Sequence, residues 1–332
     1  MYDLIRQPAE QLQIVFRNTA QKTGLHEAII EKDFWVCLTL DYLFHKCPWA
    51  KAFTFKGGTS LSKCYRLIQR FSEDIDLILD WRVLGYEQNE PWEDRSNTKQ
   101  DAFNKEANAR AERFLEEQLL PLLRNDLSEI LGQEAILFIL PEDTQTICFQ
   151  YPRIFEDTSV MQQIRLEIGA LAAWTPSVQK TIVSYIAECY PKAFSQPGTM
   201  VLTAAAERTF WEKATILYHE ANRPEHLSMP DRYSRHYYDL YCIAHSENKT
   251  AAFEELSLLK KVVDFKMKFY PRKWAHYELA KPGSLKLVPP EYRMDELWKD
   301  YASMSNMMFG EYPDFDTLIA YIRELEKEIN AL

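Results

Sequence analysis

The order of hydrophobic and polar residues changes character along the chain. Within residues 1–203, several short segments are rich in β-branched and aromatic residues or alternate between apolar and polar side chains, as β-strands do. They predict strands at 53–56, 75–80, 135–140, 146–151 and 163–168, and short edge strands at 180–186 and 200–202. Longer segments repeat apolar residues at helical spacing and predict helices at 4–22, 26–46 and 98–131. Pro121 should kink or break the last of these helices.

From residue 204 onward, the strong patterns are all helical. They predict helices at 204–221, 232–246, 248–269 and 313–330, with a loop at 282–293. A chain of 332 residues is also long for a single hydrophobic core. We therefore expect an α+β fold with two domains, a mixed α/β domain at 1–203 and a helical domain at 204–332.

Two glycines follow the first predicted strand. Gly57 and Gly58 allow the backbone to adopt a positive φ and to approach a ligand closely. Thr59 and Ser60 then begin a helix predicted over 59–69. Free N–H groups at the start of a helix favour a phosphate, so this turn is a candidate phosphate site.

Two acidic residues lie at the start of the second predicted strand. Side chains alternate along a strand, so Asp74 and Asp76 share one face, and Glu73 is expected on the other. Carboxylates two residues apart lie roughly 6–7 Å apart at their Cα atoms, and such a pair can bind Mg²⁺ ions that also hold a triphosphate. The alternative is a solvent-exposed edge strand.

The segments KGGTSLSK and RFSEDIDL resemble those of the AbiEii/AbiGii group of toxin nucleotidyltransferases, within the DNA polymerase β-like superfamily. Further similar blocks follow the same order along the chain: EKDFWV at 31–36, RLEIGA at 165–170, ERTFWEKATILYH at 207–219, YSRHYYDLY at 233–241 and DYASMSNMMFGEYPDF at 300–315. The resemblance implies a polymerase β-like mixed-sheet head, followed by a helical C-terminal domain that completes the active site.

The resemblance also implies roles for individual residues. Glu167 would be a third acidic residue, holding a metal ion or accepting a proton, and Lys213 would reach the triphosphate. Asp239 would lie in the active site near Lys213, while Lys63 and Arg235 would add positive charge for the nucleotide. The alternatives are an exposed strand glutamate, a surface lysine and an Arg235–Asp239 ion pair across one helical turn.

Two sites within these segments are not assigned a catalytic role. His236 stands where the family form commonly has an acidic residue, so the sequence assigns it no role. Glu31, Lys32 and Asp33 are expected to dock the second predicted helix onto the sheet, although Lys32 could instead face a phosphate.

The activity implied by this resemblance is transfer of a nucleoside monophosphate from an NTP to an acceptor hydroxyl, with Mg²⁺ or Mn²⁺ as cofactor. The protein would be the toxin of a type IV toxin–antitoxin (abortive infection) system, with an antitoxin protein as partner. The acceptor could be a tRNA, another RNA, a protein or a small molecule such as an antibiotic. A nucleotide-sensing protein without activity is a further alternative, although the intact set of Asp74, Asp76 and Lys213 argues against it.

Charge and composition narrow these possibilities. A net charge of −10 argues against a general nucleic-acid binder and is compatible with a compact acceptor pocket for a small molecule. One local exception is the segment 259–273, where basic residues alternate with aromatic ones. It is either a contact for RNA phosphates or the solvated face of an amphipathic helix. The basic residues are Lys260, Lys261, Lys266, Lys268, Arg272 and Lys273.

Other features of the composition point to the cytoplasm. The six cysteines are scattered without a C-x-x-C motif, so we expect reduced thiols. No apolar segment is long enough to span a membrane, and the N-terminus lacks the apolar stretch of a signal peptide.

Overall fold

The computed structural model describes residues 1–72, 74–157, 161–171 and 176–332, and Glu73 lies outside them. The chain divides into two compact units. The first contains residues 1–64 and 73–203, and the second contains residues 65–72 and 204–332. The second unit therefore includes a short segment that lies, in the sequence, between two strands of the first.

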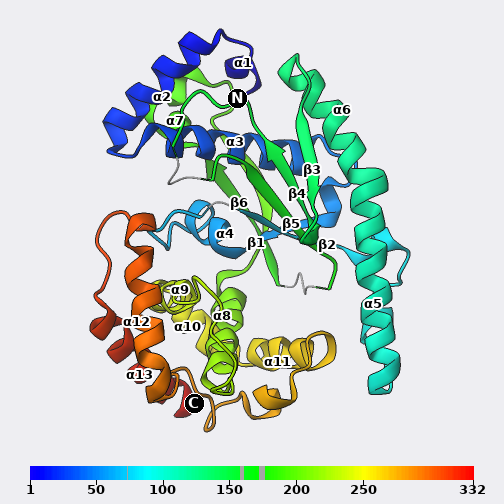
Figure 1. Ribbon diagram of the computed structural model, residues 1–332, viewed down its shortest axis with the longest axis vertical. Helices are drawn as coiled ribbons and strands as arrows, with labels where there is room; N and C mark the ends of the chain where they lie inside the picture. The colour runs from blue at the N-terminus through cyan, green and yellow to red at the C-terminus, as the bar shows by residue number, and fades with distance from the viewer. Residues whose placement is uncertain (73, 158–160, 172–175) are drawn as a thin grey trace. The chain divides into compact units, whose positions relative to one another are not determined.

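Among the described residues, seven strands of the first unit form one mixed sheet in the order β3-β4-β5-β2-β1-β7-β6 (Figure 1). The predicted strands all form, but β7 pairs with β1 inside the sheet and is not an edge strand. β1 and β2 pair antiparallel, as do β4 and β5, whereas β2 and β5 pair parallel. The strands are β1 Phe53–Lys56, β2 Ile75–Leu79, β3 Ile136–Leu140, β4 Asp143–Gln150, β5 Ile164–Gly169, β6 Ser177–Val183 and β7 Gly198–Ala204.

The helices of the first unit differ from the predicted ones. The helix expected over 4–22 is divided into Tyr2–Ile5 and Ala9–Thr23. The helix expected over 59–69 ends at Lys63, and Arg66 follows with a positive φ of 54° that no α-helix allows. Pro121 does not interrupt the long helix, because a π-helical turn, Leu115–Leu119, precedes it and accommodates a residue without an N–H donor. Figure 1 shows α5 and α6 as one long rod. The helices are α1 Tyr2–Ile5, α2 Ala9–Thr23, α3 Glu27–His45, α4 Gly57–Lys63, α5 Asn97–Phe114, α6 Leu120–Leu131 and α7 Tyr185–Cys189.

Helix α3 covers one face of the sheet. Its Trp35 stacks on Tyr151 with ring centroids 5.8 Å apart, and it meets Phe149 edge-on at 6.1 Å. Because side chains alternate along β4, Phe149 faces α3 while Thr146 and Cys148 face the other side of the sheet. The face opposite α3 is therefore the one that carries Cys148 and Thr146.

Polar side chains of α3 fix its position in the first unit. Glu31 accepts hydrogen bonds from the backbone N–H groups of Ile154 (2.7 Å) and Phe155 (3.2 Å). Lys32 donates to the carbonyl oxygen of Met161 at 2.5 Å, and Asp33 accepts from the backbone of Tyr185 at 2.8 Å. The docking role predicted for Glu31, Lys32 and Asp33 is confirmed.

The second unit is helical apart from its connecting segments. The helix expected over 248–269 is divided into two, because Glu255 leaves helical geometry at φ −116° and ψ 59°. The rings of Trp211 on α8 and Phe253 on α10 stack with their centroids 6.2 Å apart, so these two helices pack together. Segment 65–72 joins this unit through Phe71, whose N–H donates to the carbonyl of Met307 at 2.7 Å. The helices are α8 Ala206–Ala221, α9 Arg235–Ala244, α10 Asn248–Glu254, α11 Ser257–Phe269, α12 Met294–Ser303 and α13 Phe315–Asn330.

The helices of the described residues were compared with the requirements for spanning a membrane. None of them combines the length and the apolar character that a bilayer span requires.

Candidate functional site

The sheet aligns four polar residues in one row on the face opposite α3. Asp76 on β2 is in register with Lys56 on β1 and with Glu167 on β5, and Glu167 is in register with Thr146 on β4. Residues directly opposite each other on paired strands share a face of the sheet. The parallel pairing of β2 with β5 therefore places Glu167 beside Asp76.

Gly57 is in direct contact with the Asp76 carboxylate. Its φ is +80°, a left-handed conformation that side chains other than glycine rarely adopt. A Cβ atom at this position would lie 1.8 Å from Oδ2 of Asp76. Both the positive φ and the lack of space for a Cβ atom thus require glycine. The carboxylate of Asp76 lies directly against the turn that starts α4.

The two hydroxyl residues after the glycines are used inside the protein. Thr59 donates through Oγ1 to the backbone carbonyl of Asp74 at 2.5 Å, so it ties the residue before β2 to α4. The Oγ of Ser60 lies 2.8 Å from Oγ1 of Thr203, which in turn donates to the carbonyl of Phe55 at 3.0 Å. Both Thr59 and Ser60 are buried, so they shape the turn and position Asp74.

Lys63 also has a partner within the first unit. Its Nζ lies 2.6 Å from Oδ1 of Asp33 on α3 and 4.3 Å from the centre of the Tyr185 ring. This ammonium group is buried and paired with Asp33, and the nucleotide contact expected from the sequence stays a prediction.

The carboxylates of this row suit a hard divalent cation. In the part of the chain that the structure describes, no three or more His, Cys, Asp and Glu side chains gather closely enough to hold a metal ion. Mg²⁺, however, commonly takes only one or two carboxylates from a protein and completes its shell with water and substrate phosphates. Asp74 and Asp76 are both half-buried, and their oxygen donors fit that pattern.

The second unit contains a separate buried charge cluster. Asp239 on α9 accepts hydrogen bonds from Arg70 at 2.7 and 2.9 Å and from Nζ of Lys213 at 2.7 Å. Burial by itself would raise the pKa of Asp239, but these two cations hold the pKa well below its usual value. The carboxylate therefore stays ionised and carries the negative charge of the cluster.

Lys213 lies between Asp239 and a neutral histidine. Its Nζ is 3.0 Å from Nδ1 of His236. Burial and the neighbouring Lys213 lower the pKa of His236, so its neutral ring accepts a hydrogen bond from the lysine ammonium. Burial also lowers the pKa of Lys213, with Asp239 opposing the change. The surface-lysine alternative for Lys213 is wrong, because its side chain is only 9 % exposed.

Arg70 is the member of this cluster that the sequence did not single out. It begins the block RFSEDIDL, yet its partner Asp239 lies 169 positions away, and no local pattern announces that pairing. Arg70 forms the ion pair with Asp239 that the alternative interpretation assigned to Arg235. Arg235 is half-buried and forms no ion pair with Asp239 in the described chain.

The basic segment of the second unit does not form one continuous charged face. Lys260 pairs with Asp264 at 2.6 Å. Lys266 is half-buried with its Nζ 5.7 Å from the centre of the Tyr277 ring, and burial lowers its pKa to about 7. Arg272 and Lys273 are exposed. Contact with RNA phosphates is thus open to Arg272 and Lys273 more than to Lys266.

Comparison with known proteins agrees with this geometry. Residues 41–321 match the family model described as "Nucleotidyl transferase AbiEii toxin, Type IV TA system". The chain is also similar to the solved structure of MenT4, a nucleotidyltransferase toxin from Mycobacterium tuberculosis, with a TM-score of 0.52 and 16 % sequence identity over 96 % of this chain and 90 % of that chain. At that identity, the likeness to MenT4 shows a shared fold. No curated protein sequence matches the chain.

Proposed function

The chain belongs to the AbiEii family of nucleotidyltransferase toxins of type IV toxin–antitoxin systems, and we propose that it transfers a nucleoside monophosphate from an NTP to a hydroxyl group of RNA, such as tRNA. The observation that carries the proposal is the arrangement around Asp76. Its carboxylate touches a turn that only glycine can form, and it lies in register with the acidic Glu167.

The proposed roles of the first unit follow from that arrangement. Asp74 and Asp76 would hold Mg²⁺ or Mn²⁺, which supplies charge neutralisation to the phosphates when it is bound. Gly57 and Gly58 would contact the phosphates through their backbone, since the Asp76 carboxylate fills the side-chain space at Gly57. Glu167 stands next to Asp76 and would accept the proton of the attacking hydroxyl.

The transfer itself is a displacement at the α-phosphorus of the NTP. The acceptor oxygen forms a bond to that phosphorus, the bond to the oxygen that bridges the β-phosphorus breaks, and pyrophosphate leaves with the electron pair. Little covalent chemistry is required of the protein, so alignment of the reactants and stabilisation of the transferred charge supply most of the rate.

The second unit contributes residues whose roles rest on the family resemblance. We propose that Lys213 contacts the triphosphate, that Arg235 adds positive charge, and that Asp239 with Arg70 positions the Lys213 ammonium. The buried contacts within 2.9 Å that surround Asp239 support the positioning role, because they fix the lysine in one orientation.

A partner and an alternative acceptor complete the proposal. The family implies an antitoxin protein that restrains this enzyme. A small-molecule acceptor is the second candidate, because the net charge of −10 favours a cationic compound over a polyanion.

The test is incubation of the purified protein with each α-³²P-labelled NTP, total tRNA and Mg²⁺, followed by separation of RNA, protein and small molecules. Label on RNA that disappears with EDTA supports the proposal. Label that appears only on protein or on an added aminoglycoside would refute the RNA acceptor. Label on RNA that persists with EDTA would refute the requirement for a divalent metal ion.

A further inference from the structure

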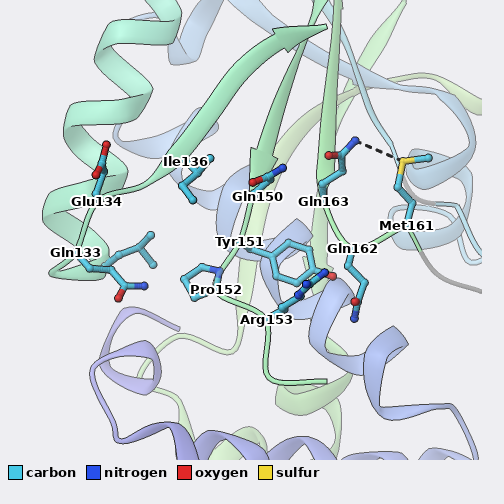
Figure 2. A pocket seen from close by; sticks show the side chains of 11 residues that line it. Gln133, Glu134, Ile136, Gln150, Tyr151, Pro152, Arg153, Met161, Gln162 and Gln163 are labelled. Atoms are coloured by element: carbon cyan, nitrogen blue, oxygen red, sulfur yellow. Dashed lines mark hydrogen bonds between the residues drawn. The ribbon is translucent and has the colours of Figure 1, made fainter. Parts of the chain in front are cut away.

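A cavity of about 550 Å³ opens in the first unit where β3, β4 and β5 meet their neighbouring loops. Figure 2 shows Ile136 on β3, Gln150 on β4 and Gln163 just before β5, with Tyr151 and Arg153 just beyond the end of β4. A volume of several hundred Å³ is typical of a site for a small molecule or for one residue of a polymer. None of the roles proposed above uses this cavity.

Strand register places the floor of the cavity on the same face of the sheet as the row that carries Asp76 and Glu167, here called the acidic row. Gln150 pairs with Ile136, and it follows Cys148, which pairs with Arg165, by two residues. Gln163 likewise precedes Arg165 by two residues and Glu167 by four. Residues at even spacing share a face, so the cavity floor lies on the acidic face, about 13 Å from Glu167 along β5.

Arg165 occupies the interval between the cavity and the acidic row. Within the described residues, its Nε is buried and has no hydrogen-bond partner. A buried guanidinium N–H without a partner is costly. The planar guanidinium fork binds phosphate in a bidentate manner, so a phosphate at this position would satisfy it.

The position of the cavity distinguishes the acceptor from the NTP. In the sheet, β1 with its Gly57 turn lies on one side of β2, and β5, β4 and β3 lie on the other. The attacking and leaving oxygens lie roughly in line across the transferred phosphorus. If pyrophosphate leaves over the Gly57 turn, the acceptor approaches from the β5 side, which is the side of Arg165 and the cavity.

We propose that this surface binds the end of a single-stranded RNA acceptor, with one nucleobase in the cavity, a backbone phosphate on Arg165 and the terminal hydroxyl beside Glu167. The inference rests on the proposed function and specifies how its acceptor is held. Four glutamine side chains line the cavity, and an amide can donate and accept as the edge of a base does. They are Gln133, Gln150, Gln162 and Gln163. Gln162 also donates to the carbonyl of Phe155, and Gln163 donates to Sδ of Met161 at 3.7 Å.

A protein acceptor fits this surface less well. The lining side chains of the cavity include one acid, Glu134, and one base, Arg153, so there is no strong charge to select a peptide side chain. Unstacked RNA bases, by contrast, are recognised by hydrogen bonds to their edges and by stacking on aromatic rings or arginine planes. Arg153 supplies a guanidinium plane at the cavity, whereas the Tyr151 ring is buried and stacks on Trp35.

The test compares the double variant Gln150→Ala/Gln163→Ala with the control Gln118→Ala, which removes an exposed glutamine from the π-helical turn before α6. The KM for total tRNA should rise about fivefold or more in the double variant, the lower range for a lost amide–base contact, while the KM for NTP changes less than twofold. The control should match the wild type in both.

A second measurement asks whether a base is the group that is recognised. A short single-stranded RNA with a free 3′ hydroxyl is compared with versions that are abasic at one of the last three nucleotides. The wild type should bind one of the abasic versions several-fold more weakly in fluorescence anisotropy, and the double variant should lose that discrimination. Arg165→Gln should reduce the dependence of binding on salt by about one unit of slope, and Arg165→Lys should restore part of it.

Two kinds of result would overturn the inference, and they differ from each other. Labelled tRNA with an unchanged KM in the double variant, or an abasic penalty that persists in it, refutes the cavity assignment and leaves the RNA transferase intact. Label on protein or a small molecule, with none on RNA in the wild type, refutes the RNA acceptor together with the inference.

Discussion

Replacing Gly57 with alanine tests the contact between the glycine turn and Asp76. The new Cβ would lie 1.8 Å from Oδ2 of Asp76, whereas ordinary contact begins near 3.4 Å. The carboxylate therefore has to move by about 1.6 Å, the difference between these two distances. A displacement of about 1 Å at a reacting centre can lower a rate about a hundredfold, so we expect Gly57→Ala to reduce nucleotide transfer at least that much.

The same substitution has a calculable effect on stability. A left-handed conformation costs alanine about 1–2 kcal/mol, and forcing Asp76 from its rotamer adds about 1 kcal/mol. We therefore expect the free energy of unfolding, measured by urea denaturation, to fall by about 2–3 kcal/mol.

Gly24 provides a matched control. Its φ is +73°, close to that of Gly57, but a Cβ there would have nothing within 4 Å. Gly24→Ala should therefore carry only the conformational cost of about 1–2 kcal/mol and leave transfer unchanged. Wild-type transfer by Gly57→Ala, or an equal loss of transfer in Gly24→Ala, would refute the reasoning.

Three further predictions concern charge. Asp239→Asn leaves Arg70 and a buried lysine without a counter-charge, so the free energy of unfolding should fall by about 3–5 kcal/mol in urea denaturation. Burial raises the pKa of Glu31 from 4.5 to about 7, so the folded protein holds this proton longer, and the free energy of unfolding should decline by up to about 3 kcal/mol as pH rises from 4.5 to 7. Arg272→Glu/Lys273→Glu should weaken tRNA binding and flatten its salt dependence, leaving the affinity for NTP unchanged.

Each of these predictions has a result that contradicts it. A change below 1 kcal/mol in Asp239→Asn would mean that the cluster contributes little to the fold. Glu31→Gln should remove the Glu31 contribution to the pH dependence of the free energy of unfolding. If that pH dependence is the same in the variant as in the wild type, it comes from other groups. An unchanged salt dependence in the double charge reversal would remove Arg272 and Lys273 from the path of the RNA.

Local patterns made most of the fold predictable. Strands and helices were readable because their periodicity depends on neighbouring residues, and the role of Asp33 in docking α3 followed from its position in an apolar helix. The end of α4 at Lys63 was not readable, because the segment after it is held by contacts with residues more than 160 positions away. The break predicted at Pro121 does not occur, because the π-helical turn before it accommodates a residue without an N–H donor.

The candidate site was predictable in part for the same reason. Gly57 and Asp76 are close in sequence and carry a recognisable spacing, so their association could be expected. Arg70 and Lys63 could not be assigned, since their partners come from distant helices. The cavity beside Gln150 depends on the register of three strands, which no single segment of sequence specifies.

The most direct test of the central claim is nucleotide transfer by Asp74→Asn and Asp76→Asn at saturating Mg²⁺, because each substitution keeps the shape of the side chain and removes its charge. Asp101→Asn, on an aspartate 64 % exposed on α5, is the control. We predict that transfer from α-³²P-labelled NTP falls at least about a hundredfold in the first two variants and is unchanged in the third, with urea denaturation like that of the wild type in all three. Near wild-type transfer by both Asp74→Asn and Asp76→Asn would contradict the account.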